Sequence, residues 1–162
     1  MPIICTRMIP SSSSRPAVEV RQQLSAEPLD LAVLLARAHH PGAGAVVLFS
    51  GEVRDHNHGK SVTHLEYEAY EPLAEKMIAE ILAGARKKWS LHIAVACHRI
   101  GRVGVGETAV VVITASAHRE EAYAANKYII DRIKREAPIW KCEYYIDGTK
   151  EWGTNCQLPS TC

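Results

Sequence analysis

The sequence lacks any uninterrupted apolar run long enough to cross a bilayer, and its first residues lack the apolar stretch of a secretory signal. It also lacks the Cys-x-x-Cys spacing that structural zinc sites use. The five cysteines are odd in number, which argues against a disulfide framework and favours a reducing compartment. We therefore expect a cytoplasmic protein with no membrane segment and no bound metal.

An excess of charge of either sign is missing as well. Lysine and arginine number 19 against 18 aspartates and glutamates, and aromatic residues make up 6% of the chain. Nucleic-acid-binding proteins usually carry a basic face, often with stacking aromatic residues, so this balance argues against that class. The sequence also has no P-loop, Gly-x-Ser-x-Gly or His-Glu-x-x-His motif. Any recognition of charge must therefore be local.

The chain does contain enough apolar sequence for one folded domain. Its 162 residues are 47% hydrophobic and 23% charged, which is typical of a globular protein. The serine-containing start, residues 1–16, is expected to be a disordered leader, with an organelle transit peptide as the alternative. We place a single domain over residues 17–155 and a loose tail over residues 156–162.

Hydrophobic periodicity divides this domain into helices and strands. Apolar residues at helical spacing predict one short and two long helices, over 31–38, 72–89 and 119–136. Runs of β-prone residues predict six strands, over 17–24, 44–53, 62–70, 91–100, 107–115 and 139–146. Several neighbouring strands have short connections, which predicts an α+β fold with a mainly antiparallel or mixed sheet.

Some of these elements carry finer expectations. The run 44–53 is nearly continuous in apolar residues and is expected to be a mostly buried strand. Leu73 and Ile81 are expected among the inward positions of the first long helix. The glycine-rich segment 101–106 is interpreted as a turn, and Ser116 as the N-cap of the second long helix.

The first candidate site is the start of that helix, Ser116-Ala117-His118-Arg119. A helix N-terminus offers unpaired N–H groups and a partial positive charge, so an anion can bind there. His118 and Arg119 would add two donors. A phosphate or carboxylate site is one interpretation, and a solvated pair of cations is the other.

The second candidate site is the pair Lys134 and Lys141, on either side of a break at Pro138. A lysine amine can act as a nucleophile or a base. Glu143 shares a strand face with Lys141 because strand side chains alternate, so it could hold one lysine charged. The plainer alternative is that both lysines are surface groups, since a cation in the last turn already suits the helix dipole.

Three further motifs are weaker. Arg54 follows a strand end, where binding residues are common, but it could be an ordinary surface residue. His56 and His58 have a spacing that suits a metal, yet no other ligand lies nearby, so exposed loop histidines are favoured. Cys97 and His98 must point to opposite faces of a strand and cannot form a dyad. A cationic set suited to an anionic small molecule remains: Arg54, His118, Arg119, Lys134 and Lys141.

Four segments resemble, in order, the signature segments of the large, catalytic subunit of molybdopterin synthase: FSGEVRDHNHGKSVTHLEYEAYEP, HRIGRVGVGE, SAHREEA and IKREAPIWKCE. The resemblance covers about residues 17–155. It implies an α/β-hammerhead fold and a homodimer that binds a small ubiquitin-like sulfur-carrier subunit on each protomer, giving a heterotetramer.

The same resemblance implies a sulfurtransferase of molybdenum cofactor biosynthesis. The thiocarboxylate at the carrier's C-terminus would supply sulfur to cyclic pyranopterin monophosphate (precursor Z), and two transfers would build the dithiolene of molybdopterin. No tightly bound cofactor is implied, because the carrier delivers the sulfur and the pterin is the substrate.

Carried over by position, the resemblance makes Lys134 and Lys141 the catalytic residues. The substrate-binding set becomes Glu52, Val53, Arg54, His118, Arg119, Lys134, Lys141, Cys142 and Glu143. Cys142 stands where the family usually has a cation; a tolerated substitution explains it more simply than a sulfur relay. The alternative function is a non-catalytic module that binds a ubiquitin-like sulfur carrier. From the residues alone, a Schiff-base lysine enzyme is a further alternative.

Overall fold

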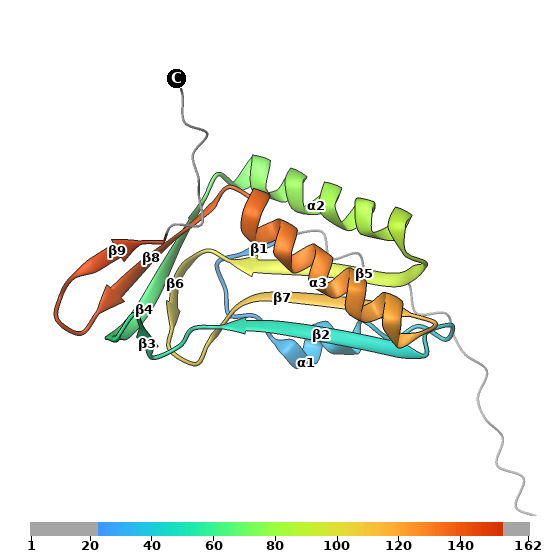
Figure 1. The fold of residues 1–162 in the computed structure, drawn as a ribbon, viewed down its shortest axis with the longest axis horizontal. Coiled ribbons are helices and arrows are strands. Elements are labelled where there is room, and N and C mark those ends of the chain that lie inside the picture. The colour runs from blue at the N-terminus through green and yellow to red at the C-terminus, as the bar shows by residue number, and fades with distance from the viewer. Residues whose placement is uncertain (1–22, 154–162) are drawn as a thin grey trace, which may run out of the picture.

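Two β-sheets and two long helices make up the fold of residues 23–153, the part of the chain that the computed structural model describes (Figure 1). The helices are α1 (Leu31–Ala36), α2 (Glu71–Lys88) and α3 (Arg119–Glu136). The strands are β1 (Leu24–Ser25), β2 (Ala45–Glu52), β3 (His56–Asn57), β4 (Lys60–Ala69), β5 (Leu91–Arg99), β6 (Gly101–Gly104), β7 (Thr108–Ser116), β8 (Ile139–Tyr145) and β9 (Lys150–Trp152). The predicted leader 1–16, most of the first predicted strand and the predicted tail 156–162 lie outside the described residues.

The first sheet has four strands in the order β1-β5-β7-β2, and the two long helices cover one of its faces (Figure 1). β1 is parallel to β5, and the other pairs are antiparallel. Successive side chains of the central strand β7 point to opposite faces of the sheet, and both faces are covered. Val110 and Val112 pack under α2 and α3, whereas Val111 and Ile113 pack with residues of α1.

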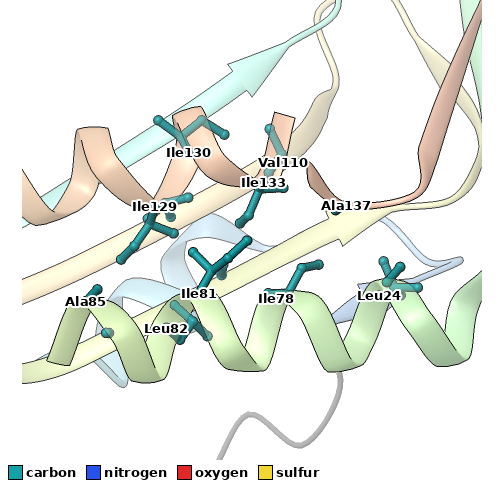
Figure 2. Close-up of a cluster of buried hydrophobic side chains, with 14 residues drawn as sticks. Leu24, Ile78, Ile81, Leu82, Ala85, Val110, Ile129, Ile130, Ile133 and Ala137 are labelled. Atoms are coloured by element: carbon teal, nitrogen blue, oxygen red, sulfur yellow. The ribbon is translucent and has the colours of Figure 1, made fainter. Parts of the chain in front are cut away.

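The main core lies between the two long helices and this sheet. Figure 2 shows Ile129 and Ile133 of α3 close to Ile78 and Ile81 of α2, and all four belong to one buried cluster. A buried amide also fixes α3 to the sheet, because Asn126 Nδ2 donates to the carbonyls of Val47 and Val112, each at 3.0 Å. These contacts hold the end of α3 at a defined place over the sheet.

The second sheet runs in the order β3-β4-β8-β9, with β6 also paired to β4, and it stands at one end of the first sheet (Figure 1). Its inner face carries a separate apolar cluster that includes Val62, Leu65 and Tyr145. The C-terminal end of α3 leads directly into β8. The junction between the two sheets therefore also contains the end of α3.

The α+β prediction, with its mainly antiparallel sheet and two long helices, is confirmed. Asp30 caps α1 as the sequence indicates, since its side chain accepts a hydrogen bond from the amide of Val33. Within residues 23–153, none of the helices combines the length and the apolar character needed to cross a bilayer.

Four of the finer expectations are wrong. The strand β2 is not mostly buried, because it forms an edge of its sheet and Val46 remains 36% exposed. Leu73 is exposed, because the buried stripe of α2 begins instead at Ala74. Ser116 ends β7, and its hydroxyl donates to the carbonyl of His118; His118 itself is the N-cap residue, without a side-chain cap bond.

The fourth error concerns the segment 101–106, which is more than a turn. Gly101 and Gly106 do have the positive φ values of turn glycines, 78° and 79°. Between them β6 pairs with β4 across the junction, a long-range contact that periodicity cannot reveal. The return strand β9 is likewise absent from the prediction.

Candidate functional site

A cavity of about 290 Å³ lies at the junction of the two sheets and the end of α3. The first sheet contributes Glu52 and His98, which lie at the ends of β2 and β5, and α3 contributes Ile133 and Lys134. Residues of β4 and β8, together with the loop after β2, complete the lining: Arg54, His56, Asn57, Val62, Leu65, Tyr67, Ile139, Lys141 and Glu143. Segments far apart in the sequence thus meet around one space.

Three cations from three different elements line this cavity: Arg54, Lys134 and Lys141. Lys134 lies in the last turn of α3, where a cation suits the negative end of the helix dipole. Its Nζ is 5.9 Å from the centre of the Phe49 ring. Arg54 donates weakly to Asn57 Oδ1, at 3.4 Å. The structure therefore brings together the residues that the sequence could only suggest as separate candidates.

A buried carboxylate faces these cations. Glu143 is 5% exposed, and its Oε1 lies 2.6 Å from Lys141 Nζ. Its Oε2 accepts hydrogen bonds from Asn57 Nδ2 at 2.7 Å and from the Tyr145 hydroxyl at 3.0 Å. Burial acts to raise the pKa of Glu143, but the bonds from Lys141 and Asn57 outweigh it and lower the pKa below its ordinary value of 4.5. Glu143 is therefore an anion that fixes the position of Lys141.

Two glycines lie close to residues of this cavity: Gly51 lines it, and Gly153 packs against Lys141. At Gly153, an added Cβ would lie 2.9 Å from Lys141 Cε, and the backbone amide of Gly153 donates to the Lys141 carbonyl at 2.7 Å. At Gly51, a Cβ would lie 2.7 Å from Val110 Cγ1, so the close approach there is a side chain of the neighbouring strand. The missing side chains leave room for Lys141 and for the cavity itself.

His118 and Arg119 do not share this cavity. They line a separate cleft at the start of α3, with Gly44, Glu120 and Glu121. Lys134 lies fifteen residues further along the same helix, which at 1.5 Å per residue is about 22 Å. One protomer therefore cannot bring the five predicted cations to a single ligand, and the prediction of one cationic set is corrected in this respect.

Two other predicted binding residues point away from the cavity. Val53 is 3% exposed and packs in the apolar cluster of the second sheet. Cys142 alternates with Lys141 and Glu143 along β8, so its thiol faces the opposite side of the strand and is 1% exposed. Burial raises the pKa of the Cys142 thiol, which works against a role as a sulfur relay. Glu52 does line the cavity, as predicted.

Sequence reasoning missed three polar lining residues: Asn57, Tyr67 and His98. His98 was considered only as a partner for Cys97, and the two do face opposite sides of β5. Tyr67 lies within the predicted strand 62–70, but nothing in the sequence indicates that a cavity lies beside it. A polar residue at an inward strand position is the signal that could have identified both.

The loop histidines give no sign of a metal centre. His56 and His58 are exposed, and His56 Nδ1 contacts Asp55 Oδ1 at 2.5 Å. Within residues 23–153, no group of three or more potential ligand side chains is arranged to hold a metal ion. The chemistry that this cavity offers is instead that of fixed cations beside a buried carboxylate: anion binding, charge stabilisation and proton transfer by an amine.

Comparison with known proteins places this arrangement in a family. The profile of the family described as "MoaE protein" matches residues 24–136. A molybdopterin synthase catalytic subunit of Thermoplasma volcanium is 46% identical over 125 residues, which are 77% of this chain and 89% of the relative. The crystal structure of molybdopterin synthase from Staphylococcus aureus matches with a TM-score of 0.77 and 39% identity, over 82% of this chain and 96% of that one.

The same fold occurs in a protein complex from Helicobacter pylori, described as subunits 1 and 2 of molybdopterin-converting factor. That match has a TM-score of 0.69 and 21% identity, over 82% of this chain and 90% of the other. At this identity the likeness concerns the fold alone.

Proposed function

The chain belongs to the MoaE family of molybdopterin synthase catalytic subunits, and from this premise we propose that its cavity transfers sulfur to a pterin. The substrate is cyclic pyranopterin monophosphate (precursor Z). The sulfur comes from the C-terminal thiocarboxylate of a small ubiquitin-like carrier protein. Two such transfers produce the dithiolene of molybdopterin.

The observation that carries this proposal is the convergence of Arg54, Lys134 and Lys141 on one cavity beside Glu143. The cyclic phosphate of the substrate and the thiocarboxylate of the carrier are both anions. Cations in a partly enclosed cavity stabilise them more strongly than cations in open water would. Both reactants can therefore be held close together, which itself accelerates a reaction between them.

The two lysines have different surroundings and so receive different roles. Lys141 is held by the Glu143 carboxylate at 2.6 Å and is suited to orient the carrier's C-terminus or the substrate. Lys134 makes no ion pair with any residue in the range 23–153. It is the amine available to act as an acid or base, or to stabilise charge, while the thiocarboxylate attacks the pterin side chain.

The carrier protein is the partner that this chemistry needs, and no tightly bound cofactor takes part in the proposal. The Helicobacter complex of two molybdopterin-converting-factor subunits is consistent with such a partner for this fold. We infer that the chain end of the carrier enters the cavity beside Lys141 and Arg54, two of its lining residues. A C-terminal segment without bulky side chains, such as Gly-Gly, suits that approach.

A homodimer is the second part of the proposal, and it bears on His118 and Arg119. These residues lie about 22 Å along α3 from Lys134, so they can serve the same reaction only if a second copy of the chain brings them to the cavity. In a symmetric dimer each protomer would then complete the site of the other.

The function is tested by reconstitution. The purified chain is mixed with precursor Z and a thiocarboxylated carrier, and the pterin product is followed by mass spectrometry for the gain of two sulfur atoms. We expect dithiolene formation that requires all three components, and none when the carrier ends in an ordinary carboxylate. Tight carrier binding without any product would support the alternative, a non-catalytic module that binds a ubiquitin-like sulfur carrier.

The dimer is tested by mixing two inactive proteins, Lys134→Ala and the double variant His118→Ala/Arg119→Ala. If each site combines lysines of one protomer with His118 and Arg119 of the other, a mixed dimer regains one complete site. Random exchange at equal amounts is then expected to restore about a quarter of the wild-type activity. Absence of recovery, with mixed dimers demonstrated by native mass spectrometry, would show that the two clusters do not share a site across protomers.

A further inference from the structure

Two uncharged residues of the cavity lining take no part in the roles described above. Tyr67 of β4 and His98 of β5 both line the cavity, and their rings meet edge to face with centres 4.8 Å apart. They come from different sheets, so this contact spans the junction. The charged residues described above lie on the other elements that border the cavity.

The hydrogen bonding of His98 fixes which ring nitrogen is free. Its Nδ1 lies 2.7 Å from the carbonyl oxygen of Arg99, so Nδ1 carries the proton and donates it there. The other nitrogen, Nε2, has no partner among residues 23–153. In that range, two side-chain nitrogen or oxygen atoms are both fully buried and without a partner: Arg99 Nε and Glu121 Oε2. His98 Nε2 is not one of them, so this atom keeps some accessible surface. Nε2 is therefore an accessible acceptor, without a partner in the described residues, on a side chain that lines the cavity.

The protonation state of His98 supports this assignment. Burial, together with the nearby positive charge of Lys134, lowers the pKa of His98 from 6.5 to about 4, although the bond to Arg99 opposes the shift. At neutral pH the ring is uncharged, and Nε2 keeps its lone pair. Lys134 itself is an exposed cation that lines the same cavity.

Tyr67 offers the complementary group. Its hydroxyl makes no hydrogen bond within residues 23–153. Like Nε2 of His98, the hydroxyl is not among the fully buried atoms without a partner, so it also keeps some accessible surface. Burial and the neighbouring Glu143 charge raise the pKa of Tyr67 to about 12, so the hydroxyl keeps its proton and can donate. A hydrogen-bond donor and acceptor that line a cavity without protein partners raise the free energy of the empty site. A ligand that pairs with both removes this cost and so binds more tightly.

We propose that His98 and Tyr67 form a neutral recognition subsite for the heterocycle of the substrate, binding a lactam-type ring edge. His98 Nε2 accepts a hydrogen bond from a ring N–H, and the Tyr67 hydroxyl donates to a ring carbonyl or ring nitrogen. The inference rests on the proposed function, and it divides the cavity in two. The cations hold the phosphate and the thiocarboxylate, and the His98–Tyr67 subsite selects the ring.

The proposal is tested with a matched pair of ring ligands that carry no phosphate, lumazine and 1,3-dimethyllumazine. Both keep the ring carbonyls, but the dimethyl compound has lost the N–H groups. The wild-type chain is expected to bind lumazine more tightly. Affinities are measured by fluorescence titration, with Tyr123→Phe, an exposed tyrosine of α3, as the control variant.

Three variants separate the two hydrogen bonds. His98→Asn keeps a short-range donor for the Arg99 carbonyl but loses the distal acceptor, and it is expected to shrink the preference for lumazine by about 3- to 10-fold. His98→Gln, which places an amide oxygen near the position of Nε2, is expected to retain more of that preference. Tyr67→Phe is expected to weaken both ligands equally, by about 3- to 10-fold, because both retain their carbonyls.

Unchanged affinities in Tyr67→Phe and His98→Asn, or a wild-type chain that binds neither ligand, would overturn the subsite. Tyr67→Phe removes a hydroxyl without a partner in the described residues, so it is expected to fold normally even where His98→Asn does not. The reconstitution assay keeps the two proposals apart. Product formation with unaltered KM for precursor Z in both variants would leave the synthase activity standing without this subsite. Ring binding that depends on His98 and Tyr67, without any product, would leave the subsite standing without the sulfur transfer.

Discussion

Replacing Lys134 by alanine is expected to lower the rate of dithiolene formation by at least about 100-fold, the usual effect of losing a positioned acid, base or charge-stabilising group. The side chain is exposed and lies at the end of α3, so the substitution should barely change the free energy of unfolding. Only the small favourable interaction with the helix dipole is lost, about 0.3–1 kcal/mol. Carrier binding should persist, because Arg54 and Lys141 remain.

Two further variants make this result specific. Lys127→Ala removes an exposed lysine of the same helix that pairs with Asp131 outside the cavity, and it should leave the rate unchanged. Lys134→Arg keeps the positive charge but cannot give up a proton near neutral pH, so it distinguishes charge stabilisation from acid–base catalysis. A Lys134→Ala protein that forms product at close to the wild-type rate would remove Lys134 from the mechanism.

Replacing Glu143 by alanine is expected to reduce both stability and activity. The change leaves Lys141 without its carboxylate and leaves the Asn57 amide and the Tyr145 hydroxyl without their acceptor. Breaking a buried pair in this way costs about 2–4 kcal/mol of unfolding free energy, toward the lower end because the Lys141 side chain is 29% exposed. Activity should fall as well, because Lys141 is no longer fixed in the cavity. Urea unfolding and the reconstitution assay measure the two effects.

The stabilisation that Glu143 contributes is expected to decrease as the pH falls. The pKa of Glu143 is lower in the folded chain than its ordinary value of 4.5, so its stabilisation is fully present above pH 4.5 and disappears as the pH falls through the folded-state pKa. The stability difference between the wild-type chain and Glu143→Gln should therefore be largest near neutral pH and shrink in acid. Glu80→Gln, at an exposed position of α2, is the control. A difference that stays constant with pH would show that Glu143 is not a paired anion in the folded chain.

Much of the secondary structure could be predicted because it depends on local periodicity. The 18-residue helix α3 has the predicted bounds 119–136 and ends at Glu136, close to the break that Pro138 imposes. The errors arise where a neighbour decides the outcome. The burial of β2 depends on its place at a sheet edge, and β6 exists because β4 lies beside it.

Some residues of the candidate site could likewise be predicted from the sequence, and others could not. The alternation along β8 correctly placed Lys141 and Glu143 on one face, and by the same rule it places Cys142 on the other. The resemblance to the family identified both lysines, although residue spacing alone gave them no more weight than surface groups. His98 and Tyr67 went unnoticed as site residues, because a cavity is a property of packed elements and leaves no trace in a single strand.

By itself, the sequence determined which segments become helices and strands, which side chains share a face, and which family the chain belongs to. The elements and the shared faces follow from residue types at short spacing, and the family follows from the resemblance of four segments to its signature segments. Only the tertiary structure decided that Arg54, Lys134, Lys141 and Glu143 surround one cavity and that His118 and Arg119 lie at the opposite end of α3. The physical reason is that the cavity forms where two sheets meet around the end of a helix. The distances across it depend on how those elements pack and not on the order of residues within any of them.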